Sequence, residues 1–271
     1  MVKIRSCFKW LFIGLVLLFI YAPILLLTVY SFNESNSIRE WTGFGLDHYK
    51  YFFSFENAPL QIVLQTLLLA AVVATLSTLL GTIGALGIFY SKKKTASMLS
   101  GINQIPVINA DVVTAISFAL LATFLGWNDG ESYLPLVLGQ TMLCTPFVVL
   151  SVMPKLKQMD GSLYEAALDL GATPTKALFS AVIPQIIPGI ISGFLLAVTL
   201  SLDDYVIAAY TKPETFNTIS THIYGLTKGK QVETIKASYW AFTAIVFLII
   251  VIVVAVLNIV ANKKAKEAKR K

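Results

Sequence analysis

The sequence predicts an all-α membrane protein in which six transmembrane helices form one domain over residues 1–271. The first observation is composition: 56% of the residues are hydrophobic and only 13% are charged, whereas soluble domains carry about 25% charged residues. The second is that the apolar residues form runs close to the roughly 20 residues that a helix needs to cross a bilayer. The third is that no lysine or arginine falls inside these runs. Together these observations exclude a water-soluble globular protein.

Six apolar runs are predicted to span the membrane as helices, because backbone polar groups in lipid must be satisfied within the helix. They are residues 10–31, 60–90, 104–125, 133–153, 185–210 and 237–261. The first run follows basic residues, as a secretory signal does, but it is longer than a signal and lacks a convincing cleavage site with small residues. We therefore expect it to remain as the first span.

The basic residues are divided unequally between the two sides of these spans. Most of the 21 lysine and arginine residues fall at the N-terminus, in the loops around 92–94 and 155–176, and in the tail 263–271. Because Lys and Arg are enriched in cytoplasmic loops, both termini are predicted to be cytoplasmic. The sequence thus predicts a multi-pass protein of a cell membrane.

Residues that could carry chemistry are sparse. Cys7 and Cys144 are too few for a disulfide framework. His48 and His222 lack acidic or cysteine partners at metal-ligand spacing. The stretch 225–231 has only three residues between its glycines, and a glutamine where a phosphate-binding loop needs Ser or Thr. We therefore expect no catalytic residue, no metal site and no cofactor in this chain.

The loop between the fourth and fifth spans carries the signals of two short helices. Ser162 and Glu165 have the spacing of a capping box, which begins a helix. Gly171 suits the left-handed conformation that ends one. Thr173 and Pro174 are typical of an N-cap and a first helical turn, so a second helix is predicted to start there. The result is a helix-turn-helix elbow, whose apolar side needs a partner to bury it.

The residues of this elbow have a recognisable spacing. Glu165, Ala166 and Ala167 are followed after three residues by Gly171, and the pattern closes with Ile183 and Pro184. This arrangement resembles the EAA loop of ABC importer permeases. Two apolar positions depart from the family pattern, since Ala181 stands where the family usually has Ile and Ile183 where it has Leu.

Further matches are scattered along the whole chain. They are Trp41, Gly43, Phe44 and Tyr49 in the first outer loop, Asp111 in the third span, and residues 199–204 in the fifth. With these residues the chain is similar to permeases of the PotC type, which belong to spermidine/putrescine importers. The resemblance implies a type I ABC importer permease fold in a bacterial inner membrane, with half of a translocation pore and a cytoplasmic coupling helix within residues 154–184.

The same resemblance implies a set of partners. A dimer of ATPase subunits would bind ATP and Mg and receive the coupling helix, for which Glu165, Ala166, Ala167, Gly171 and Pro184 are the candidate residues. A second permease would complete the pore, and an extracytoplasmic binding protein would deliver a polyamine. No nucleic acid is implied. The alternative for Glu165 is that it only caps its own helix.

Three carboxylates, Asp111, Asp203 and Asp204, lie in predicted spans where no cationic side chain can pair with them. Ionised acids in a membrane are costly and usually face a cavity, a partner or a pathway. Polyamines carry two or more ammonium groups, and aromatic rings such as Tyr205 add cation–π attraction, so these four residues are candidates for a cation path. Adjacent helical residues point about 100° apart, so the alternative for one of the Asp pair is a hydrogen bond to a neighbouring helix or to the companion permease, or a neutral state.

Two other functions stay open from the sequence. One is an ABC permease for another small solute. The other is a cation-coupled secondary carrier, in which the membrane acids would bind protons or sodium. Such carriers often contain two related halves, and the sequence shows no convincing internal repeat.

Overall fold

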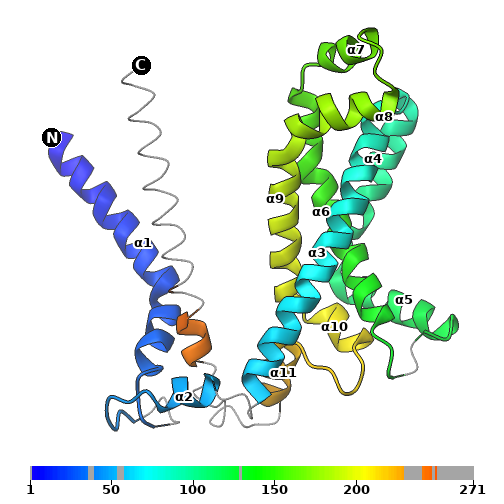
Figure 1. The fold of residues 1–271 in the computed structure, drawn as a ribbon. Coiled ribbons are helices and arrows are strands. Elements are labelled where there is room, and N and C mark those ends of the chain that lie inside the picture. The colour runs from blue at the N-terminus through cyan, green and yellow to red at the C-terminus, as the bar shows by residue number, and fades with distance from the viewer. Residues whose placement is uncertain are drawn as a thin grey trace. The chain divides into compact units, whose positions relative to one another are not determined.

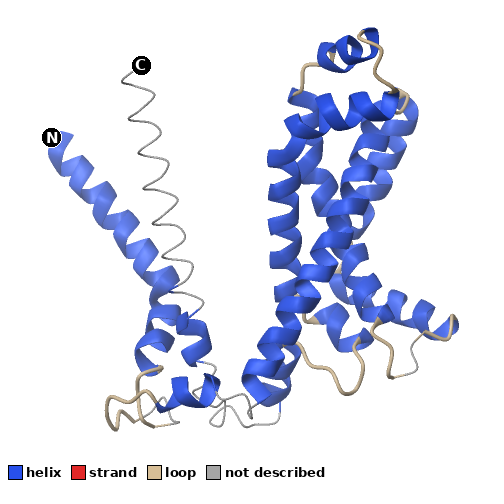
Figure 2. Cartoon of the chain, viewed as in Figure 1, coloured by secondary structure: helices blue, strands red, loops and turns tan. Residues whose placement is uncertain are grey.

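The computed structural model describes residues 2–35, 40–53, 58–127, 130–228, 240–245 and 248. These residues are helical apart from loops and one isolated antiparallel bridge between Asn33 and Phe44 (Figure 2). The chain divides into two compact units, Met1–Gln61 with Gly225–Lys271, and Ile62–Tyr224. The all-helical fold class predicted from the sequence is confirmed.

The first unit contains α1 (Val2–Tyr30) and α2 (Asp47–Phe53), joined by a loop that folds against the end of α1. The buried Asn33 side chain organises this loop, since its Nδ2 donates to the Glu40 carbonyl over 2.7 Å and its Oδ1 accepts from the Thr42 N–H over 3.0 Å. Aromatic rings pack around it in the pairs Tyr30–Trp41, Trp41–Phe44, Phe32–Phe44 and Phe32–Tyr49. The aromatic residues matched in the first outer loop therefore form one cluster.

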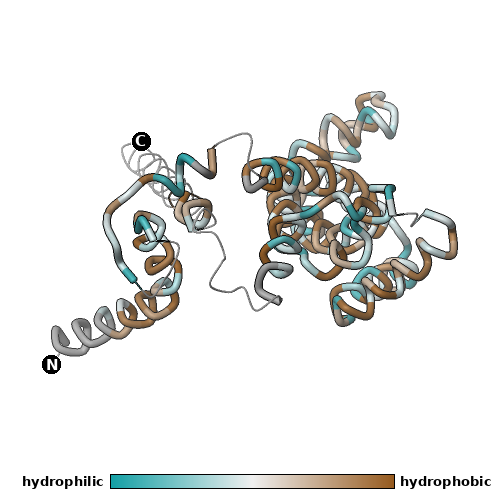
Figure 3. The backbone as a smooth tube through the Cα atoms, turned by 90° about the horizontal axis from the view of Figure 1, so that it is seen from below, coloured by the Kyte–Doolittle hydropathy of each residue, from teal (hydrophilic) through white to brown (hydrophobic). Residues whose placement is uncertain are grey.

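The second unit is a bundle built on four helices, α3 (Ala58–Tyr90), α4 (Lys93–Ile108), α6 (Leu134–Gln158) and α9 (Ile183–Asp203), which run alongside one another in Figure 1. Hydrophobic residues cover much of these helices in Figure 3, as expected for helices surrounded by lipid. Four helical segments of the described chain are long and apolar enough to cross a membrane, namely Phe12–Tyr30, Leu60–Tyr90, Leu134–Gln158 and Pro174–Asp203. They correspond to the first, second, fourth and fifth predicted spans.

Helix α6 forms the centre of this bundle, and its Val148 is fully buried. Glycines allow the neighbouring helices to approach it closely. A Cβ atom added to Gly81 of α3 would lie 2.6 Å from Val148 Cβ, and one added to Gly193 of α9 would lie 3.0 Å from Val148 Cγ1. Helices in lipid gain little hydrophobic free energy by associating, so van der Waals packing at small residues supplies much of the free energy of association.

The third predicted span, 104–125, is not one continuous helix, so the prediction of an unbroken helix there is wrong, although Lys93–Ile108 and Asp111–Phe124 together are long and apolar enough to form one bent span. Helix α4 ends at Ile108, and α5 (Asp111–Phe124) continues at an angle of 102°. The break consists of Asn109 and Ala110, which both have extended backbone conformations with ψ of 149° and 131°. The Asn109 side chain donates to Thr114 Oγ1 over 3.1 Å, which ties the break to the first turn of α5.

The fifth predicted span also ends earlier than expected. Helix α9 stops at Asp203, Asp204 is extended with ψ 114°, and a short helix α10 (Val206–Thr211) follows. Helix α11 (Ile219–Lys228) comes next. The sixth predicted span, 237–261, lies mainly outside the described residues, of which 240–245 are helical. It therefore stays a prediction, as does the count of six.

Candidate functional site

The predicted elbow is present between α6 and α9. Its first helix, α7 (Ser162–Asp169), ends in two backbone hydrogen bonds. Gly171 N–H donates to the Leu168 carbonyl over 2.9 Å, and Ala172 N–H donates to the Ala167 carbonyl over 3.1 Å. This pair of bonds is the Schellman motif, in which the first residue after the C-cap has a left-handed conformation. Gly171 has φ +84°, so its predicted role as the helix stop is confirmed.

The predicted capping box at the start of this helix is wrong. Gly161 occupies the N-cap position, and Ser162 is already the first helical residue. The backbone N–H of Ser162 instead donates a hydrogen bond to Asp160 Oδ1 over 3.0 Å. The Ser162 hydroxyl first, and the Ser162 N–H second, hold the pKa of the exposed Asp160 carboxyl below its ordinary value by hydrogen bonding to it. Glu165 is left exposed, with no hydrogen bond or ion pair to any other described residue.

The second half of the elbow follows the sequence prediction. Thr173 is the N-cap of α8 (Pro174–Ala177), and its Oγ1 accepts from the Lys176 N–H over 3.4 Å. A π-helical turn, η1 (Leu178–Val182), joins α8 to α9. Pro184 lies in the first turn of α9, directly after this π-helical turn.

The elbow exposes an apolar surface while one ring anchors it to the bundle. Leu163 and Leu170 are 47% and 89% exposed, and Ala166 is exposed beside Glu165. On the opposite side Tyr164 is half-buried and its ring lies 5.6 Å from that of Tyr90 at the end of α3. The elbow thus presents a surface suited to a partner protein and is fixed to a helix of the bundle.

The Asp pair at the end of α9 has two different environments. Asp204 is 9% exposed, and its carboxylate accepts hydrogen bonds from Gln140 Nε2 over 2.8 Å, from Ile207 N–H over 3.1 Å and from Ala208 N–H over 3.0 Å. Ser201 Oγ donates to Gln140 Oε1 over 2.8 Å and completes the network. Asp204 therefore joins α6 to α9 and caps α10, as the hydrogen-bonding alternative predicted for one of the pair.

Gln140 was not predicted as a site residue. A glutamine in the middle of an apolar run was the available signal, because a buried amide needs polar partners. Asp203, by contrast, is exposed and has no hydrogen bond or ion pair within the described part of the chain.

An aromatic pair lies directly after the Asp residues. The half-buried Tyr205 packs its ring on that of Tyr224 in α11, with centroids 4.2 Å apart. Tyr224 was not predicted as a site residue, because its approach to Tyr205 depends on the turn between α10 and α11.

Asp111 is the first residue of α5, directly after the break between α4 and α5, and it is exposed. It lies near enough to Asp204 for electrostatic repulsion, and α5 packs against α10. The breaks that follow α4 and α9 are therefore on the same side of the bundle. Burial lowers the pKa of His222 in α11, which lies outside the membrane-spanning helices.

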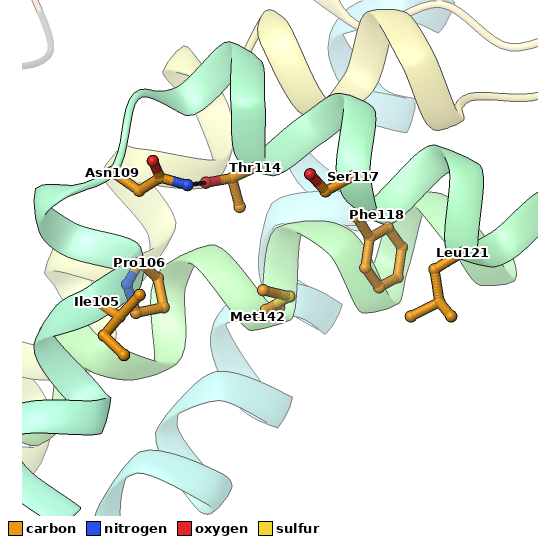
Figure 4. A pocket seen from close by; sticks show the side chains of 8 residues that line it. All are labelled: Ile105, Pro106, Asn109, Thr114, Ser117, Phe118, Leu121 and Met142. Atoms are coloured by element: carbon orange, nitrogen blue, oxygen red, sulfur yellow. Dashed lines mark hydrogen bonds between the residues drawn. The ribbon is translucent and has the colours of Figure 1, made fainter.

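A groove of ≈ 210 Å³ lies inside the bend between α4 and α5 (Figure 4). Ile105 and Pro106 of α4, Phe118 and Leu121 of α5, and Met142 of α6 make most of its wall. The polar residues along it are Asn109, Thr114 and Ser117. Within the described ranges, no group of His, Cys, Asp and Glu side chains could hold a metal ion.

Comparison with known proteins gives a consistent result. A family model described as "Binding-protein-dependent transport system inner membrane component" matches residues 3–266. The putrescine transport system permease protein PotI of Escherichia coli (strain K12) is 38% identical over 216 residues, which are 76% of this chain and 75% of that protein. The spermidine/putrescine transport system permease protein PotC of the same strain is 29% identical over 248 residues, covering 92% of this chain and 91% of that protein.

Two solved structures share the fold. A bacterial ABC transporter involved in the import of the acidic polysaccharide alginate matches with a TM-score of 0.66 at 18% identity, over 94% of this chain and 95% of that one. The bacterial alginate ABC transporter in complex with an alginate pentasaccharide-bound periplasmic protein matches with a TM-score of 0.65 at 18% identity, over 92% of each chain.

Proposed function

Because the chain belongs to the family of binding-protein-dependent transport system inner membrane components, we propose that it is the permease subunit of an ATP-driven importer of polyamines. It would form half of the translocation pore for putrescine or spermidine. The observation that carries this proposal is the 38% identity to a putrescine permease over three quarters of both chains. Alginate is not proposed as a substrate of this chain, because at 18% identity the alginate transporters share only its fold.

The free carboxylates suit a cationic cargo. Asp111 and Asp203 each lie where a helix is interrupted, and both are exposed without a partner among the described residues. Irregular backbone at membrane depth is tolerated where it is enclosed by protein or lines a water-filled cavity. An alkylammonium group passing there would meet a carboxylate and then the rings of Tyr205 and Tyr224, which attract cations through their faces. Asp204 would act by holding α10 in place.

The elbow would couple this path to ATP. Its exposed face, with Glu165, Ala166 and Gly171, would dock on an ATPase subunit, while the Ala167 carbonyl accepts from Ala172 N–H where α7 ends and Pro184 lies in the first turn of α9. Two ATPase subunits would bind ATP and Mg, so this chain would have no enzymatic activity of its own. A second permease and an extracytoplasmic polyamine-binding protein would complete the complex.

The proposed orientation places the elbow and both termini in the cytoplasm. It rests on the lysine-rich segments beside the elbow, and on the rule that such segments stay cytoplasmic. Loops with α2, α10 and α11 would then face the binding protein. A cation-coupled carrier is less well supported, because it offers no role for an elbow with an uncovered apolar surface.

Uptake of labelled polyamines tests this function directly. The chain would be expressed together with an ATPase, a second permease and a binding protein of the same transporter, in bacteria that lack polyamine uptake. ATP-dependent uptake of putrescine or spermidine, lost when the ATPase is inactivated, is the expected result. Uptake that persists without the ATPase and follows the proton or sodium gradient would overturn the proposal in favour of the carrier.

A further inference from the structure

A second groove lies at the end of the bundle nearest the elbow. It has a volume of ≈ 240 Å³ and is lined by Ile88 and Phe89 of α3, Ala96, Ser97 and Ser100 of α4, and Met153 and Lys157 of α6. It is separate from the groove between α4 and α5 and shares no residue with it. None of its residues belongs to the proposed cation path or to the elbow.

The floor of this groove is apolar, while its edge is polar and positive. Ile88 is buried, and Phe89, Ala96 and Met153 are half-buried, so hydrocarbon lines the interior. Lys157 is exposed in the last turn of α6. Such a groove suits a ligand with both a hydrocarbon part and an anionic part.

The two serines of α4 are available as hydrogen-bond donors. Serines elsewhere in the long helices, such as Ser151 and Ser192, donate to the carbonyl four residues earlier. Ser97 and Ser100 make no such bond, and no hydrogen bond joins either side chain to another described residue. Their hydroxyl groups are therefore free to bond an oxygen of a ligand in the groove.

A second ammonium group belongs to the same edge. Residues three and four apart lie on one face of a helix, and Lys93 precedes Ala96 and Ser97 by these intervals. Neither Lys93 nor Lys157 forms an ion pair in the part of the chain that the structure describes. Lys157 thus lines the groove beside free hydroxyl groups and an apolar floor, and Lys93 lies on the face of α4 that carries Ala96 and Ser97.

From this complementarity we propose that the groove between α3, α4 and α6 binds an anionic phospholipid. The phosphate would lie between Lys93 and Lys157 and accept from Ser97 and Ser100, and the acyl chains would leave along Ile88 and Met153. The position fits, because the lysines lie at the ends of membrane helices, where basic pockets face lipid headgroups. The lipid would fasten α4 to α6 next to the elbow. This site does not depend on the proposed polyamine cargo.

Native mass spectrometry of the purified complex, with the chain and its partner subunits, tests the site. Phosphatidylglycerol and phosphatidylcholine with the same acyl chains would be titrated separately, and glycerol 1-phosphate would supply the headgroup phosphate without chains. We expect phosphatidylglycerol to bind more tightly than phosphatidylcholine, and glycerol 1-phosphate not to displace it. Equal binding of the two lipids, or displacement by glycerol 1-phosphate, would overturn the proposal.

Variants locate the binding site within the complex. Lys157→Gln and Lys93→Gln should each weaken phosphatidylglycerol binding about fivefold, as expected for one lysine near a lipid phosphate. Ala96→Phe fills the apolar floor without changing charge and should prevent binding. Lys155→Gln is the matched control, because it makes the same charge change in the same helix turn without lining the groove.

Two results would contradict the assignment. Equal weakening by Lys155→Gln and Lys157→Gln would show that only general surface charge matters. Undiminished binding to Ala96→Phe would place the lipid elsewhere. Because lipid binding is measured without polyamine, failure of the site would leave the transport proposal intact, and failure of transport would leave the lipid measurement valid.

Discussion

Gln140 and Asp204, 64 positions apart in the sequence, are joined inside the bundle by a hydrogen bond of 2.8 Å from Nε2 to the carboxylate. Gln140 is fully buried, and Asp204 also accepts from two backbone N–H groups of α10. The bond therefore ties the middle helix of the bundle to the segment that follows the break in α9. Asp204 is thus part of the packing of the bundle, whereas its neighbour Asp203 is exposed and has no hydrogen bond to another described residue.

Removing the Asp204 carboxylate should destabilise the protein. Asp204→Ala leaves the buried Gln140 donor and two N–H groups of α10 without their acceptor, which should cost roughly 1–3 kcal/mol. Thermal unfolding of the purified protein in detergent measures the loss. The adjacent change Asp203→Ala is the control and should leave the unfolding temperature unchanged, because Asp203 is exposed and unbonded. Equal losses in both variants would show that Asp204 has no special structural role.

Neutralising Asp203 should affect transport rather than stability. Asp203→Asn keeps the shape of the side chain but removes its attraction for an ammonium group, so the apparent KM for putrescine should rise about tenfold, equivalent to about 1.4 kcal/mol. Asp203→Glu retains the charge and should transport at nearly the original KM. An unchanged KM in Asp203→Asn, with normal amounts of protein in the membrane, would exclude this carboxylate from the cation path.

The same substitution at two glycines of α3 should have different effects on the stability of the protein. Gly81→Ala places a Cβ atom 2.6 Å from Val148 Cβ, so α3 and α6 must separate at a cost of roughly 1–3 kcal/mol. Gly87→Ala meets nothing within 4 Å and should be neutral or slightly stabilising. Unfolding temperatures of the two variants measure the difference. If Gly81→Ala proved as stable as Gly87→Ala, close packing against Val148 would not hold the bundle together.

The elbow can be tested with a pair of glycines at the two ends of α7. Gly171→Ala forces a side chain into φ +84° and should strain the turn by about 1 kcal/mol or more. We expect it to lower transport and polyamine-stimulated ATPase activity while the protein remains in the membrane. Gly161→Ala is the control, since Gly161 has φ −62° and open space around it. Loss of coupling in Gly161→Ala alone would contradict the proposed geometry.

The start of α7 should depend on pH through Asp160. The pKa of this carboxyl is lowered in the folded protein from its ordinary value of 3.8. The stabilisation that the ionised carboxylate gives to the start of α7 is therefore complete above pH 3.8. The contribution is lost as the pH falls through the lowered pKa, because protonation removes the acceptor of the Ser162 N–H. The amide resonance of Ser162, followed by NMR through this range, should shift with Asp160. In Asp160→Ala the shift should disappear; its persistence would assign the titration to another group.

The sequence alone was sufficient to place those elements whose signals lie within a few neighbouring residues. Gly171 marked the end of α7, and Thr173 with Pro174 marked the start of α8, because capping depends on residues within one turn. The long apolar runs likewise located α3, α6 and α9. The start of α7 was assigned to the wrong residue because Ser162 and Asp160 are both good N-terminal acceptors, and spacing alone favoured Ser162.

Other features could not be predicted because they depend on distant residues. The break at Asn109 and Ala110 contains neither Gly nor Pro, so an apolar run hides it. The different environments of Asp203 and Asp204 arise from Gln140 on another helix, which no local pattern reveals. Tyr224 reaches Tyr205 only through the path of the chain between α10 and α11.

The engagement of Asp204 limits the charge stoichiometry of the pore. Of the three acids in the predicted spans, only Asp111 and Asp203 are exposed and able to contact an ammonium group directly, because Asp204 is buried and already accepts three hydrogen bonds. Two negative groups balance a diamine such as putrescine one for one. A third ammonium group, as in spermidine, would have to find its counterion on the companion subunit. The choice between diamine and triamine would then be decided by the assembled pair of permeases rather than by this chain alone.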